Sequence, residues 1–93
     1  MIEREGERLL VKVPLLMVNA SGLLKAGCIA LRPGEQVFDF SAVGEADSSA
    51  LAVMLGWLRA GASSGAVVKF DQVPAGVRSL AELYGVKELL SLA

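Results

Sequence analysis

Residues 50–58 read A-L-A-V-M-L-G-W-L and contain no polar side chain. Asp47-Ser48-Ser49 in front of this stretch favours the start of a helix, and Gly61 behind it favours the end of one. A helix that is apolar all round must be buried on all sides. Because a small domain covers only one side of such a helix well, we expect its other side to be a docking face. The alternative is that neighbouring helices cover that side as well.

The chain has the size of one domain. Its 93 residues can form one core flanked by a few helices, so we expect a single domain over residues 1–93 with its core at about 7–92. Hydrophobic residues make up 54% of the chain, above the usual range of about 45–50%. A chain this short and this apolar is expected to expose some apolar surface, which usually meets a partner.

Charge and targeting signals exclude several classes of protein. The net charge is −1 and no basic stripe stands out, so we expect no nucleic acid to bind. The charge-free segments are shorter than the roughly 18 residues that a membrane span needs, and residues 1–5 do not resemble a signal peptide. Cys28 is the only cysteine, so no internal disulfide can form. These features predict a cytoplasmic protein without direct membrane insertion.

The residues that most enzymes use are missing. There is no histidine, which excludes catalysis and metal ligation by histidine. No lysine follows a glycine and no G-x-G-x-x-G spacing occurs, so the nucleotide-binding loops are absent. A carboxylate pair of Asp39 and Asp47 is disfavoured because one lies in a strand and the other at a helix start, and Cys28 has no histidine partner. We therefore expect no enzyme, no catalytic residue, no metal and no cofactor.

The order of apolar runs and turn residues predicts an α/β fold. After a frayed segment 1–6, we expect strands at 9–13, 36–40 and 66–70. The short apolar run 15–18 favours a further strand, although four residues do not separate a strand from a helix. Helices are expected to begin near Asn19 or Ser21, near Ser49 and near Pro74, with a short helical tail over 86–92. The repeated strand–helix–strand units imply parallel pairing with right-handed crossovers. Apolar residues on both sides of the strand 36–40 predict a central strand covered on both faces. Leu89, Leu90 and Leu92 are expected to return to the core.

Asp47-Ser48-Ser49 is the polar sequence in front of the apolar helix. Taken alone, these residue types favour a simple helix cap. A hydroxyl at this point also faces the positive end of the helix dipole, so a phosphate on it would be stabilised by free N–H groups. Such a phosphate would add about two negative charges beside the apolar helix and would disrupt an interface there.

The wider pattern resembles a known family. Asp39-Phe40-Ser41, Val43 and then Asp47-Ser48-Ser49-Ala50-Leu51 ahead of the apolar helix resemble the central signature of STAS domains. The segment Leu80-Ala81-Glu82-Leu83-Tyr84-Gly85-Val86 is similar to the last helix and Leu-rich tail of that family. The resemblance covers about residues 7–92 and implies an α/β STAS fold, a mixed sheet of about four strands with helices packed against it. One departure is Ala50, where the family usually has glycine.

Within the family, the chain resembles most the small cytoplasmic STAS subunit of Mla-type phospholipid-transport ABC complexes in Gram-negative bacteria. The resemblance implies a non-catalytic interaction subunit that binds and supports the ATPase subunit, in a complex with a permease that maintains outer-membrane lipid asymmetry. It also implies a location that is peripheral at the inner membrane through this partner. The alternative within the family is an anti-sigma factor antagonist that is switched by phosphorylation on Ser48.

The resemblance and the apolar helix together predict the partner-binding residues. Ser48, the first hydroxyl after Asp47, is the key contact or phosphorylation site that the family implies. Asp47 and Ser49 flank it in the predicted contact. Met54 and Trp57 are expected to be apolar contacts on the exposed side of the helix, since aromatic anchors tend to dominate binding energy. Formation of a weak homodimer through the same helix is left open.

Overall fold

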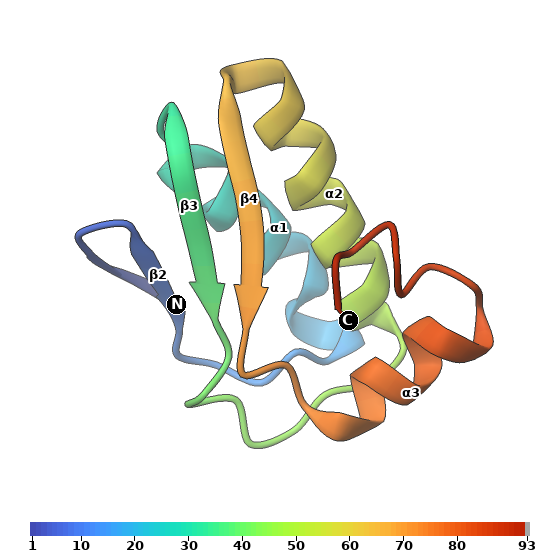
Figure 1. Cartoon of the computed structure of the whole chain (residues 1–93). Helices are drawn as coiled ribbons and strands as arrows, with labels where there is room; N and C mark the ends of the chain where they lie inside the picture. Colours follow the sequence, from blue (N-terminus) through green and yellow to red (C-terminus); the bar gives the residue numbers. More distant parts are fainter. Residues whose placement is uncertain (93) are drawn as a thin grey trace.

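The computed structural model describes residues 1–92 and shows one four-stranded sheet with helices packed against it (Figure 1). The elements, in chain order, are β1 (Ile2–Glu5), β2 (Arg8–Val11), α1 (Met17–Ala30), β3 (Gly34–Asp39), α2 (Ser49–Ser64), β4 (Ala66–Asp71) and α3 (Ala75–Leu83). The strands lie in the order β1-β2-β3-β4; β1 and β2 are antiparallel, and the other two pairs are parallel. The predicted α/β class with a mixed sheet of about four strands is confirmed.

The helices α1 and α2 cover one face of the sheet (Figure 1). Leu9, Phe38 and Phe70 are register partners on β2, β3 and β4, so they share this face. The opposite face carries Arg8 and Lys69, whose side chains are 42% and 57% exposed. The prediction that the third strand is covered on both faces is therefore wrong, because the second face carries ion pairs such as Lys69–Glu35, whose side chains are 57% and 48% exposed.

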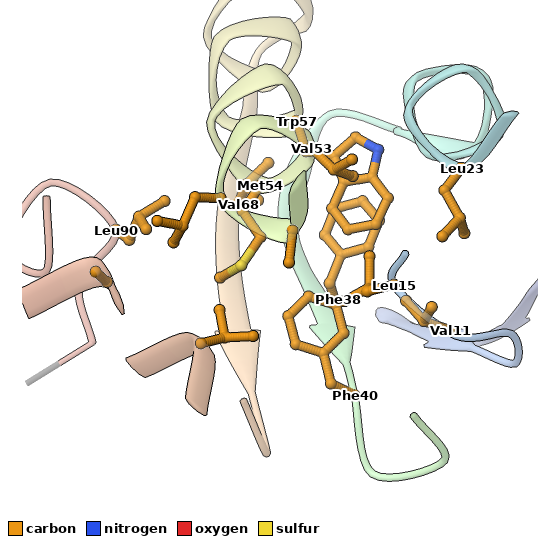
Figure 2. Close-up of a cluster of buried hydrophobic side chains, with 14 of the residues drawn as sticks. Val11, Leu15, Leu23, Phe38, Phe40, Val53, Met54, Trp57, Val68 and Leu90 are labelled. Atoms are coloured by element: carbon orange, nitrogen blue, oxygen red, sulfur yellow. The ribbon is translucent and has the colours of Figure 1, made fainter. Parts of the chain in front are cut away.

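Trp57 lies at the centre of the core, between the sheet and α1 (Figure 2). Its ring stacks on that of Phe38, with centroids 4.0 Å apart and an interplanar angle of 3°. Its indole Nε1 donates a hydrogen bond of 3.1 Å to the carbonyl oxygen of Leu24. A Cβ atom at Gly27 would overlap the indole, so glycine is what lets α1 approach α2 this closely. The alternative that neighbouring elements cover both sides of the apolar helix is the one that the structure supports.

The order of elements matches the prediction, but the first two strands are formed by other residues. Residues 1–6 are not frayed: β1 pairs with β2 in a hairpin that turns at Gly6, where φ is +61°. The segment Leu15–Val18 is not a strand, because Leu15 forms only an isolated bridge to Ala46 and α1 begins at Met17. Charged residues in β1 had suggested fraying, yet in a hairpin at the sheet edge they can face solvent.

Two predictions near the C-terminal half also need correction. The helix α2 does not end at Gly61 but continues to Ser64, and Gly65, with φ of +74°, terminates it. Gly61 is instead the point where α2 packs closely on Val68 of β4. The tail over 86–92 forms turns rather than a helix. Its Leu90 and Leu92 are buried in the core as predicted, whereas Leu89 is exposed.

Candidate functional site

The loop between β3 and α2 lies at the carboxyl end of the parallel strands, where α1 and α2 both begin (Figure 1). The segment that leads into α1 crosses this loop and is hydrogen-bonded to it. The backbone N–H of Leu15 donates to the oxygen of Glu45 at 2.9 Å, and the N–H of Asp47 donates to the oxygen of Leu15 at 2.9 Å. This pairing holds the first turns of the two helices side by side.

The carboxylate of Asp47 binds the first turns of both helices. Its Oδ2 accepts a hydrogen bond of 2.9 Å from the backbone N–H of Met17, the first residue of α1. Its Oδ1 accepts from the backbone N–H of Ser49 at 2.9 Å and from the Ser49 hydroxyl. These bonds, the one from the Ser49 hydroxyl above all, lower the pKa of Asp47. Asp47 is therefore the capping residue of the predicted triplet, and it caps two helices at once.

The two serines have different environments. The Ser49 hydroxyl donates to Asp47 and is partly buried. Ser48 is exposed, has helical backbone angles of −63° and −19°, and makes no capping hydrogen bond through its side chain. The N–H of Ala50 bonds to the Asp47 carbonyl oxygen at 3.1 Å, and the N–H of Leu51 bonds to that of Ser48 at 3.2 Å. Ser48 thus presents a hydroxyl to solvent, in agreement with its predicted role as the contact, and that role stays a prediction.

The predicted apolar contacts Met54 and Trp57 are wrong as surface residues. Both side chains are 0% exposed and belong to the hydrophobic core (Figure 2). The reason is that α2 turns this side toward the sheet and the neighbouring α1, which leaves neither residue free for a partner. In their place, the structure exposes Met17 at 73% and Val18 at 87% in the first turn of α1, next to Asp47.

Met17 and Val18 are not identified as contacts from the sequence, because a four-residue apolar run such as 15–18 fits a strand as well as a helix. A signal for their position was present in the helix that follows. The buried residues of α1 are Leu23 and Gly27, four residues apart. Extending that stripe backwards by one and two helical turns gives inward positions near 20 and 16. Position 18 then falls on the outward side of the helix, which is where the structure places Val18.

We call the surface formed by Met17, Val18, Glu45, Asp47 and Ser48 the α1–α2 docking surface. Glu45 is exposed on the loop, and the loop over 40–48 contains two acidic and no basic residues. The surface therefore combines exposed apolar side chains, a hydroxyl and negative charge. Such a surface suits a partner that offers apolar contacts bordered by cationic side chains.

Asp39 has a structural environment that does not include Asp47. Its Oδ2 accepts a hydrogen bond of 2.8 Å from Arg8, and its Oδ1 accepts one of 2.8 Å from the backbone N–H of Ser41. The hydrogen bond from Arg8, followed by that from Ser41, lowers the pKa of Asp39. Arg8 also pairs with Asp71 at 2.5 Å, so one guanidinium joins β2, β3 and β4. The carboxylate of Asp39 thus stabilises the sheet rather than forming a pair with Asp47.

Two features are absent from the residues that the structure describes, 1–92. No helix among them is both long and apolar enough to cross a membrane. No group of three or more Cys, Asp or Glu side chains among them could hold a metal ion.

Comparison with protein families gives one match that spans nearly the whole chain. Residues 3–91 match the model of the family described as "Mlab, STAS domain". No curated protein sequence matches the chain. The matched region includes every helix and all but the first residue of the sheet, together with the α1–α2 docking surface.

Proposed function

Because this chain belongs to the STAS domain family, we propose that it is a non-catalytic interaction subunit of an Mla-type phospholipid-transport ABC complex. STAS domains are generally non-catalytic, and the matched family carries the name MlaB in its description. The proposed partner is the ATPase subunit, of the MlaF type, in a complex with a permease. In this role the chain is cytoplasmic, is peripheral at the inner membrane through its partner, and supports outer-membrane lipid asymmetry.

The observation that carries this proposal is the exposure of apolar side chains at the α1–α2 docking surface. Met17 and Val18 are 73% and 87% exposed, although most large apolar residues of this chain pack into the core. Asp47 holds them at a defined distance from the exposed Ser48 through hydrogen bonds to both helix starts. Apolar side chains presented by a rigid element are the usual anchors of a protein interface.

The proposal predicts that a negative charge at Ser48 prevents binding. In Ser48→Glu, a third carboxylate joins Glu45 and Asp47, and the contact with the ATPase would have to bury it. We expect Ser48→Glu to lose co-purification with the co-expressed ATPase subunit, and Ser48→Ala to lose at most about tenfold in affinity. Both variants should melt within a few degrees of the wild type, since Ser48 makes no capping bond. Full co-purification of a folded Ser48→Glu variant would contradict the proposal.

The exposed Ser48 hydroxyl also favours a second candidate, an anti-sigma factor antagonist that a partner kinase phosphorylates on Ser48. Against it stands Asp47, which already accepts the N–H of Ser49 and would repel a phosphate. Incubation with candidate anti-sigma kinases and ATP separates the two functions. Phosphate on Ser48 would favour the switch. A neighbouring gene set of an ABC ATPase, a permease and a periplasmic lipid-binding protein would favour transport.

A further inference from the structure

We propose that the hollow between α2 and the C-terminal tail (residues 86–92) is a docking site for an acidic amphipathic segment of a partner protein. The hollow has a volume of about 270 Å³ and is lined by Leu55, Leu58, Arg59 and Leu89. We call it the α2–tail hollow. It shares no residue with the α1–α2 docking surface, and the inference does not rest on the proposed function.

Three leucines give the α2–tail hollow an apolar lining that the core does not fully use. Leu55 and Leu58 lie one helical turn apart on α2 and are only partly buried. Leu89 is 63% exposed, although the next residue, Leu90, is 1% exposed. The backbone N–H of Leu90 donates a hydrogen bond of 3.0 Å to the carbonyl oxygen of Val86. Leu89 therefore projects from an anchored segment and presents an apolar side chain to an occupant of the hollow.

Among the four lining residues, only Arg59 is charged. Its side chain forms no ion pair within the part of the chain that the structure describes. An occupant that covers the leucines removes water from the neighbouring guanidinium, and a carboxylate on that occupant would compensate for the lost hydration. The complementary occupant is therefore an apolar segment that carries an acidic residue beside its anchoring side chain.

The size and polarity of the hollow favour a protein side chain over a small molecule. Small-molecule sites usually measure about 300–1,000 Å³ and contain several convergent polar groups, whereas this hollow is smaller and offers one guanidinium. A leucine or phenylalanine anchor suits such a space. A second copy of the chain is disfavoured as the occupant, because in a twofold contact Arg59 would face Arg59 of the other copy.

Acidic residues beside the hollow disfavour an anionic membrane as the occupant. A separate hollow is lined by Glu82, Gly85, Lys87 and Glu88, and Glu88 directly precedes Leu89 in the chain. Lys87 is paired with Glu82 at 3.9 Å, so it does not offset the charge of Glu88. A surface of uniform negative charge would be repelled there. A peptide segment avoids this repulsion, because it can present a carboxylate to Arg59 and neutral or basic residues to the separate hollow.

Two synthetic helical peptides test the proposal. Both carry leucines one turn apart; the flanking residues are glutamates in the acidic peptide and lysines in the basic peptide. Titrated into the ¹⁵N-labelled full chain, the acidic peptide should shift the amide resonances of Leu58, Arg59 and Leu89. The contact is small, so we expect a dissociation constant of roughly 0.1–1 mM. The basic peptide should bind at least about fivefold more weakly.

Charge reversal at Arg59 should invert this preference. Arg59→Glu should weaken binding of the acidic peptide at least about tenfold and should bind the basic peptide more tightly than the wild type does. Arg32→Glu, at an exposed arginine outside the hollow, is the matched control and should bind the acidic peptide like the wild type. Leu89→Ser should also weaken this binding, whereas Leu83→Ser, at a leucine that is 75% exposed but outside the hollow, should not.

Several results would overturn the proposal. These are no binding of the acidic peptide, equal binding of the two peptides, or equal effects of Arg59→Glu and Arg32→Glu. Resonance shifts confined to Met17 and Val18 would place the peptide on the α1–α2 docking surface and would equally overturn it. So would binding to phosphatidylglycerol vesicles that Arg59→Glu removes, in the absence of peptide binding. Circular dichroism on each variant checks that the exposed substitutions leave the fold intact.

Discussion

At the residue scale, the carboxylate of Asp47 does more than a single helix cap requires. Its two oxygens accept hydrogen bonds from the first residues of two different helices, α1 and α2. A helix start leaves backbone N–H groups without partners, and here one side chain satisfies groups in both helices. Asp47 therefore fixes the spacing between Val18 and Ser48, the two exposed residues that the proposed function depends on.

Replacement of Asp47 by asparagine tests this double role through the pH dependence of the free energy of unfolding. The asparagine side chain has one accepting oxygen, so one helix start loses its acceptor. Since the folded-state pKa of Asp47 is below its ordinary value of 3.8, the carboxylate contributes stability above that pH and loses it as the pH falls through the folded pKa. Near neutral pH, the free energy of unfolding of the wild type should exceed that of Asp47→Asn by a constant amount. This difference should decrease as the pH falls below about 3.8.

Urea denaturation at a series of pH values measures this gap. Asp39 also has a lowered pKa, but it is common to both proteins, so its titration cancels in the difference. Wild type and Asp47→Asn that are equally stable at neutral pH would show that the double cap contributes nothing.

At the scale of elements, the packing of α1 on α2 depends on glycine. Gly27 of α1 lies against the indole of Trp57, whereas Gly76 of α3 has open space around its Cβ position. Gly27→Ala forces overpacking and should lower the free energy of unfolding by about 1–3 kcal/mol or more. Gly76→Ala is the matched control and should raise it by about 0.5–1 kcal/mol, the usual gain from alanine within a helix.

Chemical denaturation of the two alanine variants checks the sign of both changes. If Gly27→Ala were as stable as the wild type, α1 could not be packed on Trp57 as described. A loss of stability in both variants to the same extent would mean that the contact with Trp57 is not what distinguishes Gly27 from Gly76.

The elements also show what could be predicted from the sequence. The sequence predicts the strands at 36–40 and 66–70 and the helix start at Ser49 nearly as they are. Each of these segments is mostly apolar and is bounded by turn or capping residues. The hairpin over residues 2–11 could not be predicted in the same way, because the charged residues at its start favour a frayed chain end. The burial of Trp57 depends on its contact with Gly27 of α1. This contact joins residues that are far apart in the sequence, so the local pattern around Trp57 does not predict it.

The candidate site shows the same division. Asp47, Ser48 and Ser49 were predicted as a polar helix start, and they form one. The apolar part of the site, Met17 and Val18, comes from a segment thirty residues earlier in the chain. Hydrogen bonds to the loop before α2 hold this segment beside Asp47. Because this neighbourhood is created by the crossing of two segments, sequence reasoning assigned the exposed apolar side to α2 instead.

At the scale of the whole molecule, α1 and α2 pack side by side on one face of the sheet and leave the other face open (Figure 1). The open sheet face is occupied by ion pairs such as Lys69–Glu35, with both side chains about half exposed; pairs of this kind stabilise a protein little. The α1–α2 docking surface lies where the two helices begin. A domain with this arrangement can bind a partner at one end without altering its core.

In the proposed complex, the ATPase binds at the start of α1, beside Ser48. The most direct test is a titration of the purified ATPase subunit with two aspartate variants on the same helix. Val18 and Ile29 are 87% and 76% exposed and lie eleven residues apart on one side of α1, roughly 16 Å from each other. Val18→Asp should weaken binding at least about tenfold, whereas Ile29→Asp should bind like the wild type. Equal affinities for both variants, or a loss confined to Ile29→Asp, would contradict the account.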